Sequence, residues 1–254
     1  MHLVLYMCAC NRNKTTERTN SWAQSKKKER FFLCIFMALK GNNSEGSLKS
    51  AVTITEKLPI KLDGRNYLSW REQVESVIAS RNLKQFLENP RIPMIYENER
   101  DRARDILTQE YQLWLVQDQM LVTWLKSSLS AAIFPLVFQC RHSWQLWDTL
   151  HQLMVGHVRS EMKNTKKRET QSISEYVATI KGFVDSLVQM GESVSEKEHI
   201  EAILEGLPEE YDAMARVIRS RDHHPLLLVE SFLLQNEAQI QKSKVLDDGR
   251  NRNE

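Results

Sequence analysis

The spacing of apolar side chains most constrains this chain, because they recur at steps of three and four residues through most of the sequence after residue 57. Such spacing gathers apolar groups on one face of an α-helix. No segment alternates convincingly between apolar and polar residues, as a half-buried strand does. Glycine (8) and proline (6) are scarce, so the turns of a many-stranded sheet are missing. The sequence therefore predicts an all-α bundle of about eight or nine helices.

Start and stop signals place several of these helices. Ser172 with Glu175, and Ser195 with Glu198, have the spacing of capping boxes that open two helices. The longest expected helix covers residues 100–128, and the next covers 143–155. Pro135 falls between them and predicts a short helical turn, because proline breaks a continuous helix.

Tryptophan distribution predicts two lobes. Five of the six tryptophans lie between residues 70 and 147, and the last ninety residues have none. A polar, basic stretch at 156–171 separates the two regions. We expect a basic and apolar head with a linker, disordered or non-native, and two helical lobes before a disordered tail. Their boundaries are 1–57, 58–156, 157–246 and 247–254.

The head does not predict stable membrane insertion. Its apolar run at 31–39 is half of the ~18 residues that a transmembrane helix needs. The basic run before it lies too far from the start for a signal peptide. The head is interpreted as a non-native extension, with a membrane-surface or basic targeting arm as the alternative. The four cysteines form no disulfide framework, which favours a reducing compartment and predicts a cytoplasmic location.

Residues that could carry catalysis or bind a metal do not converge. Asp118 lies on the apolar stripe of the 100–128 helix, where we expect it to accept a hydrogen bond from a neighbouring cap, backbone or indole group. Cys140 has scattered histidines nearby but not the close Cys and His spacing of a zinc knuckle. No phosphate-binding glycine loop or nucleophile elbow occurs. We therefore expect no catalysis, no metal, no cofactor and no small-molecule substrate.

An ordered series of short motifs resembles a known family. The stretch Leu62-Asp63-Gly64-x-Asn66-Tyr67-x-x-Trp70 is similar to the opening of the Gag polypeptides of copia-type retrotransposons. Further family positions are Trp114, Asp118, Leu146, Trp147, Tyr176, Leu204, Leu207, Pro208 and Tyr211. The resemblance covers about residues 58–243 and implies a two-lobed, helical, capsid-like bundle. It further implies that copies of the chain assemble into virus-like particles that package element RNA.

Departures from the family pattern suggest a truncated or decayed copy. The chain between Trp147 and Lys167 looks about eight residues short, or ~12 Å of helix. His142 stands where the family usually has a threonine cap, and Leu227 replaces another usual cap. Each lost cap would cost ~1 kcal/mol.

One basic cluster remains as a candidate nucleic-acid site. Its members are Arg159, Lys163, Lys166, Lys167 and Arg168. They could contact RNA phosphates or line a capsid pore, or they could form a solvated turn between helices. Glu161 and Glu169 dilute the cluster, no aromatic residue interleaves to stack bases, and the body after residue 50 is mildly acidic. Alternatives to a capsid-like protein are an RNA-binding module that uses this segment, and a non-functional or host-adapted Gag remnant.

Overall fold

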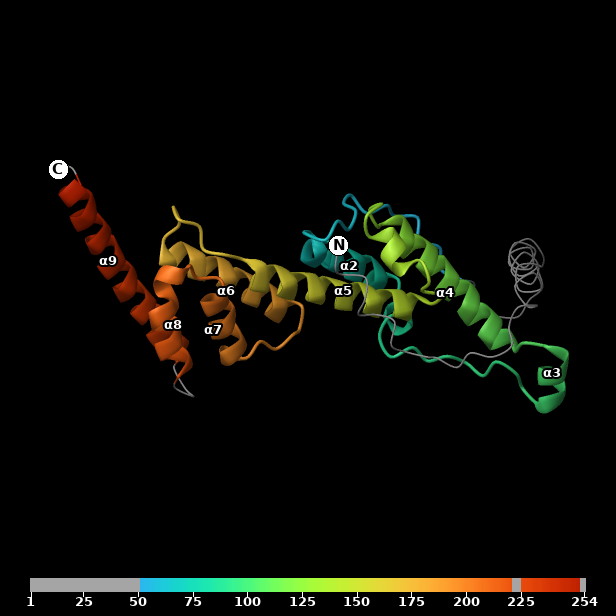
Figure 1. The fold of residues 1–254 in the computed structure, drawn as a ribbon. Coiled ribbons are helices and arrows are strands. Elements are labelled where there is room, and N and C mark those ends of the chain that lie inside the picture. The colour runs from blue at the N-terminus through green and yellow to red at the C-terminus, as the bar shows by residue number, and fades with distance from the viewer. Residues whose placement is uncertain (1–50, 221–224, 252–254) are drawn as a thin grey trace, which may run out of the picture. The chain divides into compact units, whose positions relative to one another are not determined.

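The computed structural model describes residues 51–220 and 225–251, and within them the fold is all-α, which confirms the predicted fold class (Figure 1). The expected head therefore lies outside the described residues up to position 50. The elements run in the order α2 (Tyr67–Ser80), η1 (Lys84–Phe86), α3 (Glu99–Arg104), α4 (Gln109–Ser127), η2 (Phe134–Val137), α5 (Ser143–Asn164), α6 (Ile173–Gln189), α7 (Glu196–Glu205), η3 (Glu209–Tyr211), α8 (Asp212–Arg219) and α9 (Leu226–Asn251). The expected turn at Pro135 is the 3₁₀ helix η2.

An extended segment runs along α4 before the first described helix. The Val52 N–H donates to Gln117 Oε1 at 2.6 Å, and Gln117 Nε2 donates to the Val52 carbonyl at 3.0 Å. Further on, the Trp124 indole N–H donates to the Glu56 carbonyl at 2.7 Å. Residues 52–57, the last part of the expected 1–57 head and linker region, thus contact the helical body.

The first hydrophobic core lies among α2, α4 and the first half of α5. Trp70 is fully buried at its centre, and its indole N–H donates to Ser128 Oγ at 3.1 Å. The Trp70 ring lies 5.8 Å from that of Trp147 on α5. Burying large aromatic side chains of this kind contributes ~2–3 kcal/mol each, so the aromatic residues dominate this core.

The second core is built from α6 to α9 around two buried tyrosines. Tyr176 and Tyr211 are buried with Ile180, Ile203 and Leu233. The Tyr176 hydroxyl donates to the carbonyls of Ala202 and Ile203 near the end of α7, at 3.3 and 3.0 Å. The tyrosine therefore joins α6 to α7 through its ring and its hydroxyl together.

Helix α5 contributes to both cores, and it is longer than the sequence predicted. It carries Leu146 and Leu150 into the first core and Met162 into the second. Residues 156–164 contain no proline, so the helix continues to Asn164 instead of ending near residue 155. The expected lobe boundary between residues 156 and 157 consequently falls inside this helix.

The expected helix at 100–128 is instead two helices. Asp105 adopts a left-handed conformation with φ of 57°, which ends α3. Thr108 then starts α4, because its hydroxyl accepts a hydrogen bond from the Tyr111 N–H at 3.2 Å. A local C-cap and N-cap thus override the helical spacing. At the other end of the chain, α9 continues to Asn251, into the stretch expected to be a tail.

Gly206 sits where no side chain fits. A β-carbon there would overlap both the Tyr176 hydroxyl and the Thr165 carbonyl oxygen. We expect Gly206→Ala to lower the free energy of unfolding by about 1–3 kcal/mol through overpacking. Gly182 on α6 has open space around it, so Gly182→Ala is the matched control and should raise stability by up to about 1 kcal/mol. Urea denaturation would measure both changes, and equal stability of the two variants would contradict the packing.

His199 makes folding stability depend on pH. Its buried Nε2 has no hydrogen-bond partner among the described residues, and burial lowers its pKa below the ordinary 6.5. The charged groups facing it are Lys181 and Asp185 on α6, Glu196 on α7 and Glu230 on α9. Because the unfolded chain binds this proton more readily, the stability is fully present above pH 6.5 and falls below it.

Substituting this histidine would test that dependence. We expect His199→Leu to flatten the loss of stability between pH 6.5 and 5, by up to about 1.4 kcal/mol per pH unit. Gln152 on α5 is exposed and does not titrate, so Gln152→Leu should leave the pH profile of thermal unfolding unchanged. A His199→Leu profile identical to the parent's would overturn the assignment.

Candidate assembly and nucleic-acid surfaces

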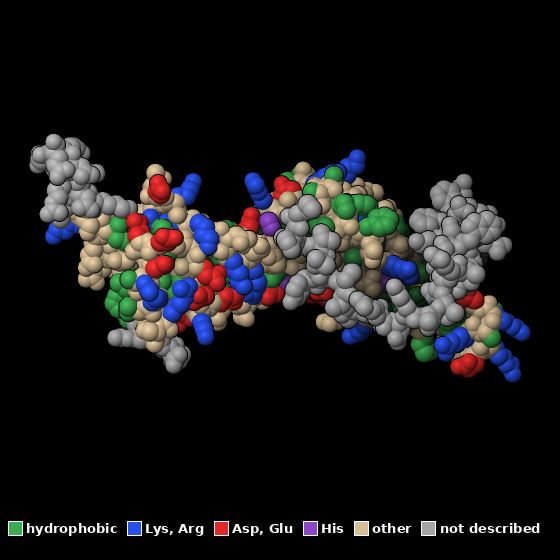
Figure 2. Space-filling model, viewed as in Figure 1, with side chains coloured by type: hydrophobic (Ala, Val, Ile, Leu, Met, Phe, Trp, Pro, Cys, Tyr) green, Lys and Arg blue, Asp and Glu red, His purple; other side chains and the backbone are tan. Residues whose placement is uncertain are grey.

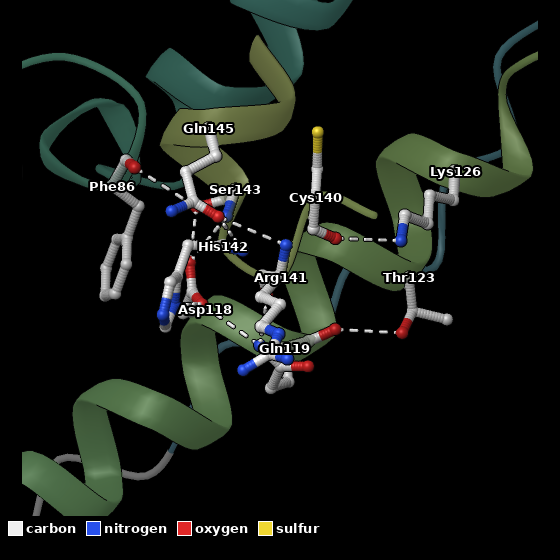
Figure 3. A network of polar contacts seen from close by, with 10 residues as sticks. All are labelled: Phe86, Asp118, Gln119, Thr123, Lys126, Cys140, Arg141, His142, Ser143 and Gln145. Atoms are coloured by element: carbon white, nitrogen blue, oxygen red, sulfur yellow. Dashed lines mark hydrogen bonds and ion pairs between the residues drawn. The ribbon is translucent and has the colours of Figure 1, made fainter. Parts of the chain in front are cut away.

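Asp118 binds the start of α5 from the middle of α4 (Figure 3). One carboxylate oxygen, Oδ1, accepts hydrogen bonds from the Ser143 N–H at 2.8 Å and from the Ser143 hydroxyl at 2.6 Å. The other, Oδ2, lies 2.8 Å from His142 Nδ1 and accepts from Gln119 Nε2 at 3.2 Å. The first N–H of α5, which has no partner within its own helix, is therefore held by a carboxylate from another helix.

The Asp118 carboxylate is not accessible to a substrate. Asp118 is fully buried, and both of its oxygens are used by neighbouring donors. Gln145 completes the turn by accepting from the N–H groups of Arg141 and His142, at 3.2 and 3.3 Å. The structure places Asp118 as a structural acceptor, and His142, which stands where the family has threonine, is one of its partners.

Two more carboxylates hold helix starts in the second core. Glu237 of α9 accepts from the Ile173 N–H, at the start of α6, at 2.9 Å. Glu196 of α7 accepts from the Leu226 N–H, at the start of α9, at 2.7 Å. This second contact supplies a partner at the helix start where Leu227 replaces the family's usual cap. Each such bond fixes the packing of two helices as well as one helix end.

A chain of polar contacts connects the two cores. The Tyr67 hydroxyl lies 3.1 Å from His151 Nδ1, and His151 Nε2 lies 3.4 Å from Glu192 Oε1. Glu192 also pairs with Arg159 at 3.5 Å, and Arg159 in turn pairs closely with Glu198. Burial raises the pKa of Tyr67 to about 12, so its hydroxyl stays protonated as a donor. These contacts join α2, α5, the loop after α6 and α7.

The basic cluster from the sequence does not form a single accessible patch. Arg159 is engaged by two carboxylates, and Lys166 donates to the Glu205 carbonyl at 2.6 Å. The Lys167 side chain is only 5% exposed, 4.0 Å from Glu237 and over the ring of Tyr211. Lys163 and Arg168 are exposed and form no ion pair within the described residues. Most of the charge that could meet RNA phosphates is used inside the molecule.

The family-motif positions are structural in this fold. Gly64 has a positive φ of 93° in the turn before α2, and the Asn66 amide donates to the Lys61 carbonyl at 2.8 Å. Pro208 precedes η3, and Leu207 packs against the second core. The remaining positions are buried in the two cores: Leu62, Tyr67, Trp70, Trp114, Leu146 and Trp147 in the first, and Tyr176, Leu204 and Tyr211 in the second.

Sequence reasoning missed exposed apolar side chains around α4. Phe134, Leu136 and Phe138 stand out of η2 and the residue after it, and we call them the ridge. Figure 2 shows hydrophobic side chains gathered over this part of the molecule. At the other end of α4, Met94 and Ile95 are exposed in the loop before α3. The available signal in the sequence was an apolar run that contains a proline, because such a run does not lie along the buried face of a continuous helix.

Within the described parts of the chain, no three His, Cys, Asp or Glu side chains are grouped to hold a metal ion. The helices there include none that is both long and apolar enough to span a bilayer.

Removing the Asp118 carboxylate should be costly. Asp118→Ala leaves the Ser143 N–H buried without its acceptor, while the Ser143 hydroxyl keeps only the Phe86 carbonyl at 3.1 Å, so we expect a loss of about 3 kcal/mol in unfolding free energy. Asp118→Asn keeps one acceptor oxygen and should lose less. Asp148→Ala, at an exposed position on α5, is the control and should change stability by under about 0.5 kcal/mol. Equal urea midpoints for all three would refute the capping role.

Comparisons with known proteins agree with the resemblance. The chain is 28% identical over 188 residues to the retrovirus-related Pol polyprotein from transposon RE1 of Arabidopsis thaliana. It is 24% identical over 185 residues to that from transposon RE2 of the same plant. Each match covers 71% of this chain but only 13% and 12% of the respective polyprotein, so the chain spans a small part of these relatives. No solved structure matches the chain significantly.

The family comparison covers most of the described fold. Residues 74–246 match the family model for the gag-polypeptide of LTR copia-type, from within α2 into α9. The matched range includes Asp118, the whole of α5 and the basic cluster. The chain belongs to the copia-type LTR retrotransposon gag-polypeptide family.

Proposed function

We propose that this chain is a capsid-like structural protein whose copies self-associate into particles. The observation that carries the proposal is the coincidence of family membership with exposed apolar side chains on a body whose buried polar groups are largely paired internally. Covering such side chains with a second copy removes apolar surface from water and therefore favours association. Weak contacts of this kind become strong in a closed assembly, because symmetry repeats them.

The proposal assigns the chain no catalytic step. Asp118, the fully buried carboxylate, has both oxygens engaged at the start of α5. Tyr176, Tyr211 and Trp70 lie in the cores, away from solvent. The exposed side chains include a set of large apolar groups, such as Met94, Leu136 and Phe138, which suit contacts between subunits.

Element RNA is proposed as cargo enclosed by the assembly. Lys163, Lys166 and Arg168 of the basic cluster are exposed, but the Lys166 ammonium donates to the Glu205 carbonyl. Within the described residues, Lys163 and Arg168 are thus the members whose charged groups bind no other group of the chain, because Arg159 and Lys167 lie against carboxylates. Two phosphate contacts per copy give weak, salt-sensitive binding that only many copies together would make useful. An RNA-binding module that acts as a single copy is therefore not favoured.

Sedimentation of the full chain over a range of concentration and salt tests the proposal. We expect species larger than the monomer to grow with concentration and to appear as particles by electron microscopy. Adding RNA should promote assembly. A plot of the logarithm of the RNA-binding constant against the logarithm of salt concentration should have a slope that is smaller by about two in the Lys163→Ala, Arg168→Ala variant. A monomer under every condition, up to millimolar protein, would contradict self-association.

A further inference from the structure

The extended segment that precedes α2 lies on the body as a single strand would. We call residues 52–58 the strap. Its half-buried and exposed residues largely alternate: Val52, Ile54 and Leu58 are half-buried, and Thr53, Thr55 and Lys57 are exposed. Such alternation is that of a strand with one face against a protein surface. Ile54 and Leu58 pack against the first core, yet no strap residue is fully buried.

Two side chains of α4 bind the backbone of the strap. The Gln117 amide holds both the N–H and the carbonyl of Val52, as a neighbouring β-strand would, and the Trp124 indole N–H holds the Glu56 carbonyl. Gln117 and Trp124 lie two helical turns apart, or about 10 Å, on one side of α4. Val52 and Glu56 are separated by about 13 Å of extended chain. The similar spacings suit an extended segment that runs along α4.

Arg81, at the end of α2, adds a side-chain requirement to these backbone contacts. Its guanidinium donates to the Thr53 carbonyl at 2.9 Å and pairs with the Glu56 carboxylate. We call Arg81, Gln117 and Trp124 the strap site. Together these three side chains fit an extended segment that has a carboxylate four residues after its first bound residue.

The strap site needs an occupant, whereas the strap itself is loosely held. Gln117 is 6% exposed and Trp124 is 8% exposed, so loss of the strap would leave their polar groups without the partners described above. A buried donor without an acceptor is unfavourable. A mostly exposed segment that is held by a few hydrogen bonds is among the first parts of a protein to open locally. Opening of the strap therefore leaves a site that favours binding of an equivalent segment.

The chain between the strap and the body can act as a hinge. Leu62 anchors the chain, because its N–H donates to the Ser128 carbonyl at 2.9 Å and its carbonyl accepts from the Ser130 N–H at 3.0 Å. Residues 59–61 connect this anchor to the strap. Pro59 has a fixed φ and restricts Leu58 before it to an extended conformation. A released strap therefore needs no new backbone conformation to bind elsewhere.

We propose that copies of this chain exchange straps, so that the strap of one copy occupies the strap site of a second copy and the reverse. The second copy's strap is the occupant because every chain already displays its fit to this site. Exchanged straps make the same contacts as before, so the exchange costs little beyond association itself. Copies held together by other contacts supply straps at high local concentration. The inference rests on the self-association proposed above and names a segment that reinforces it.

Charge reversal in the full chain tests the exchange. Glu56→Arg alters the strap and Arg81→Glu alters the strap site, so each single variant places two like charges together within its own chain. In a 1:1 mixture, each strap is complementary to the strap site of the other variant. We expect the mixed dimer to form about tenfold more tightly than the dimer of the parent chain. Native mass spectrometry separates it by mass from both homodimers, at concentrations below those at which the parent assembles.

Two controls accompany the mixture. Lys84 and Glu88 form an ion pair at 3.3 Å outside the strap site, so mixing Lys84→Glu with Glu88→Lys should give no excess of mixed dimer. The double variant Glu56→Arg, Arg81→Glu restores the opposite charges within one chain. It should unfold at the parent's Tm, and it should form no excess of mixed dimer with the parent.

The outcomes separate the exchange from the proposed function. An excess of mixed dimer for the strap pair alone supports the exchange, even if the parent forms no particles, in which case the proposed function fails by itself. No excess from variants that fold overturns the exchange, and self-association stands if the parent still assembles. An equal excess from the Lys84 and Glu88 control pair also overturns the exchange, because general charge attraction would then explain it.

Discussion

Helix α5 is the constraint on which the rest of the structure depends, because it supplies side chains to both hydrophobic cores. The second core alone lacks tryptophan, and it gains Met162 from α5, while Leu187 and Met190 at the end of α6 pack into the first core. The position of α5 is set at its first turn, where Asp118 holds the Ser143 N–H. A buried carboxylate at a helix start is stabilised by several donors and by the helix dipole.

The same device recurs wherever a helix start must be tied to another helix. Asp118, Glu196 and Glu237 each reach from one helix to the first N–H of another, at the starts of α5, α9 and α6. Basic side chains at the junction of the two cores likewise form ion pairs with carboxylates of the same chain. These internal contacts fix how the helices pack, while large apolar side chains such as Leu136 and Phe138 stay exposed on the surface.

The sequence predicted the all-α class and the capping box of Ser172 and Glu175, because helical spacing and caps are local signals. Of the second expected box, the structure forms only the half in which Ser195 accepts from the Glu198 N–H. The prediction failed where a tertiary or strongly local contact decided the outcome. Asp105 ends one helix and Thr108 begins the next, although the apolar spacing continues across them. Helix α5 continues through the polar stretch that was expected to separate the lobes, and it buries Met162 there. The internal partners of Arg159 and Lys167 lie far along the chain, so no local pattern could distinguish these cations from an RNA-binding cluster.

Native-state hydrogen exchange, read helix by helix, tests most directly whether the two cores form one body on a shared helix. If they do, the slowest amides of α2 and α4 and those of α6 and α7 should open with the same free energy, equal to that of global unfolding. The amides of α5 should be protected without interruption through residues 156–162. If α6 to α9 opened at a clearly lower free energy while α2 and α4 stayed protected, and exchange along α5 broke near residue 156, the cores would be independent lobes and the account of α5 given above would be wrong.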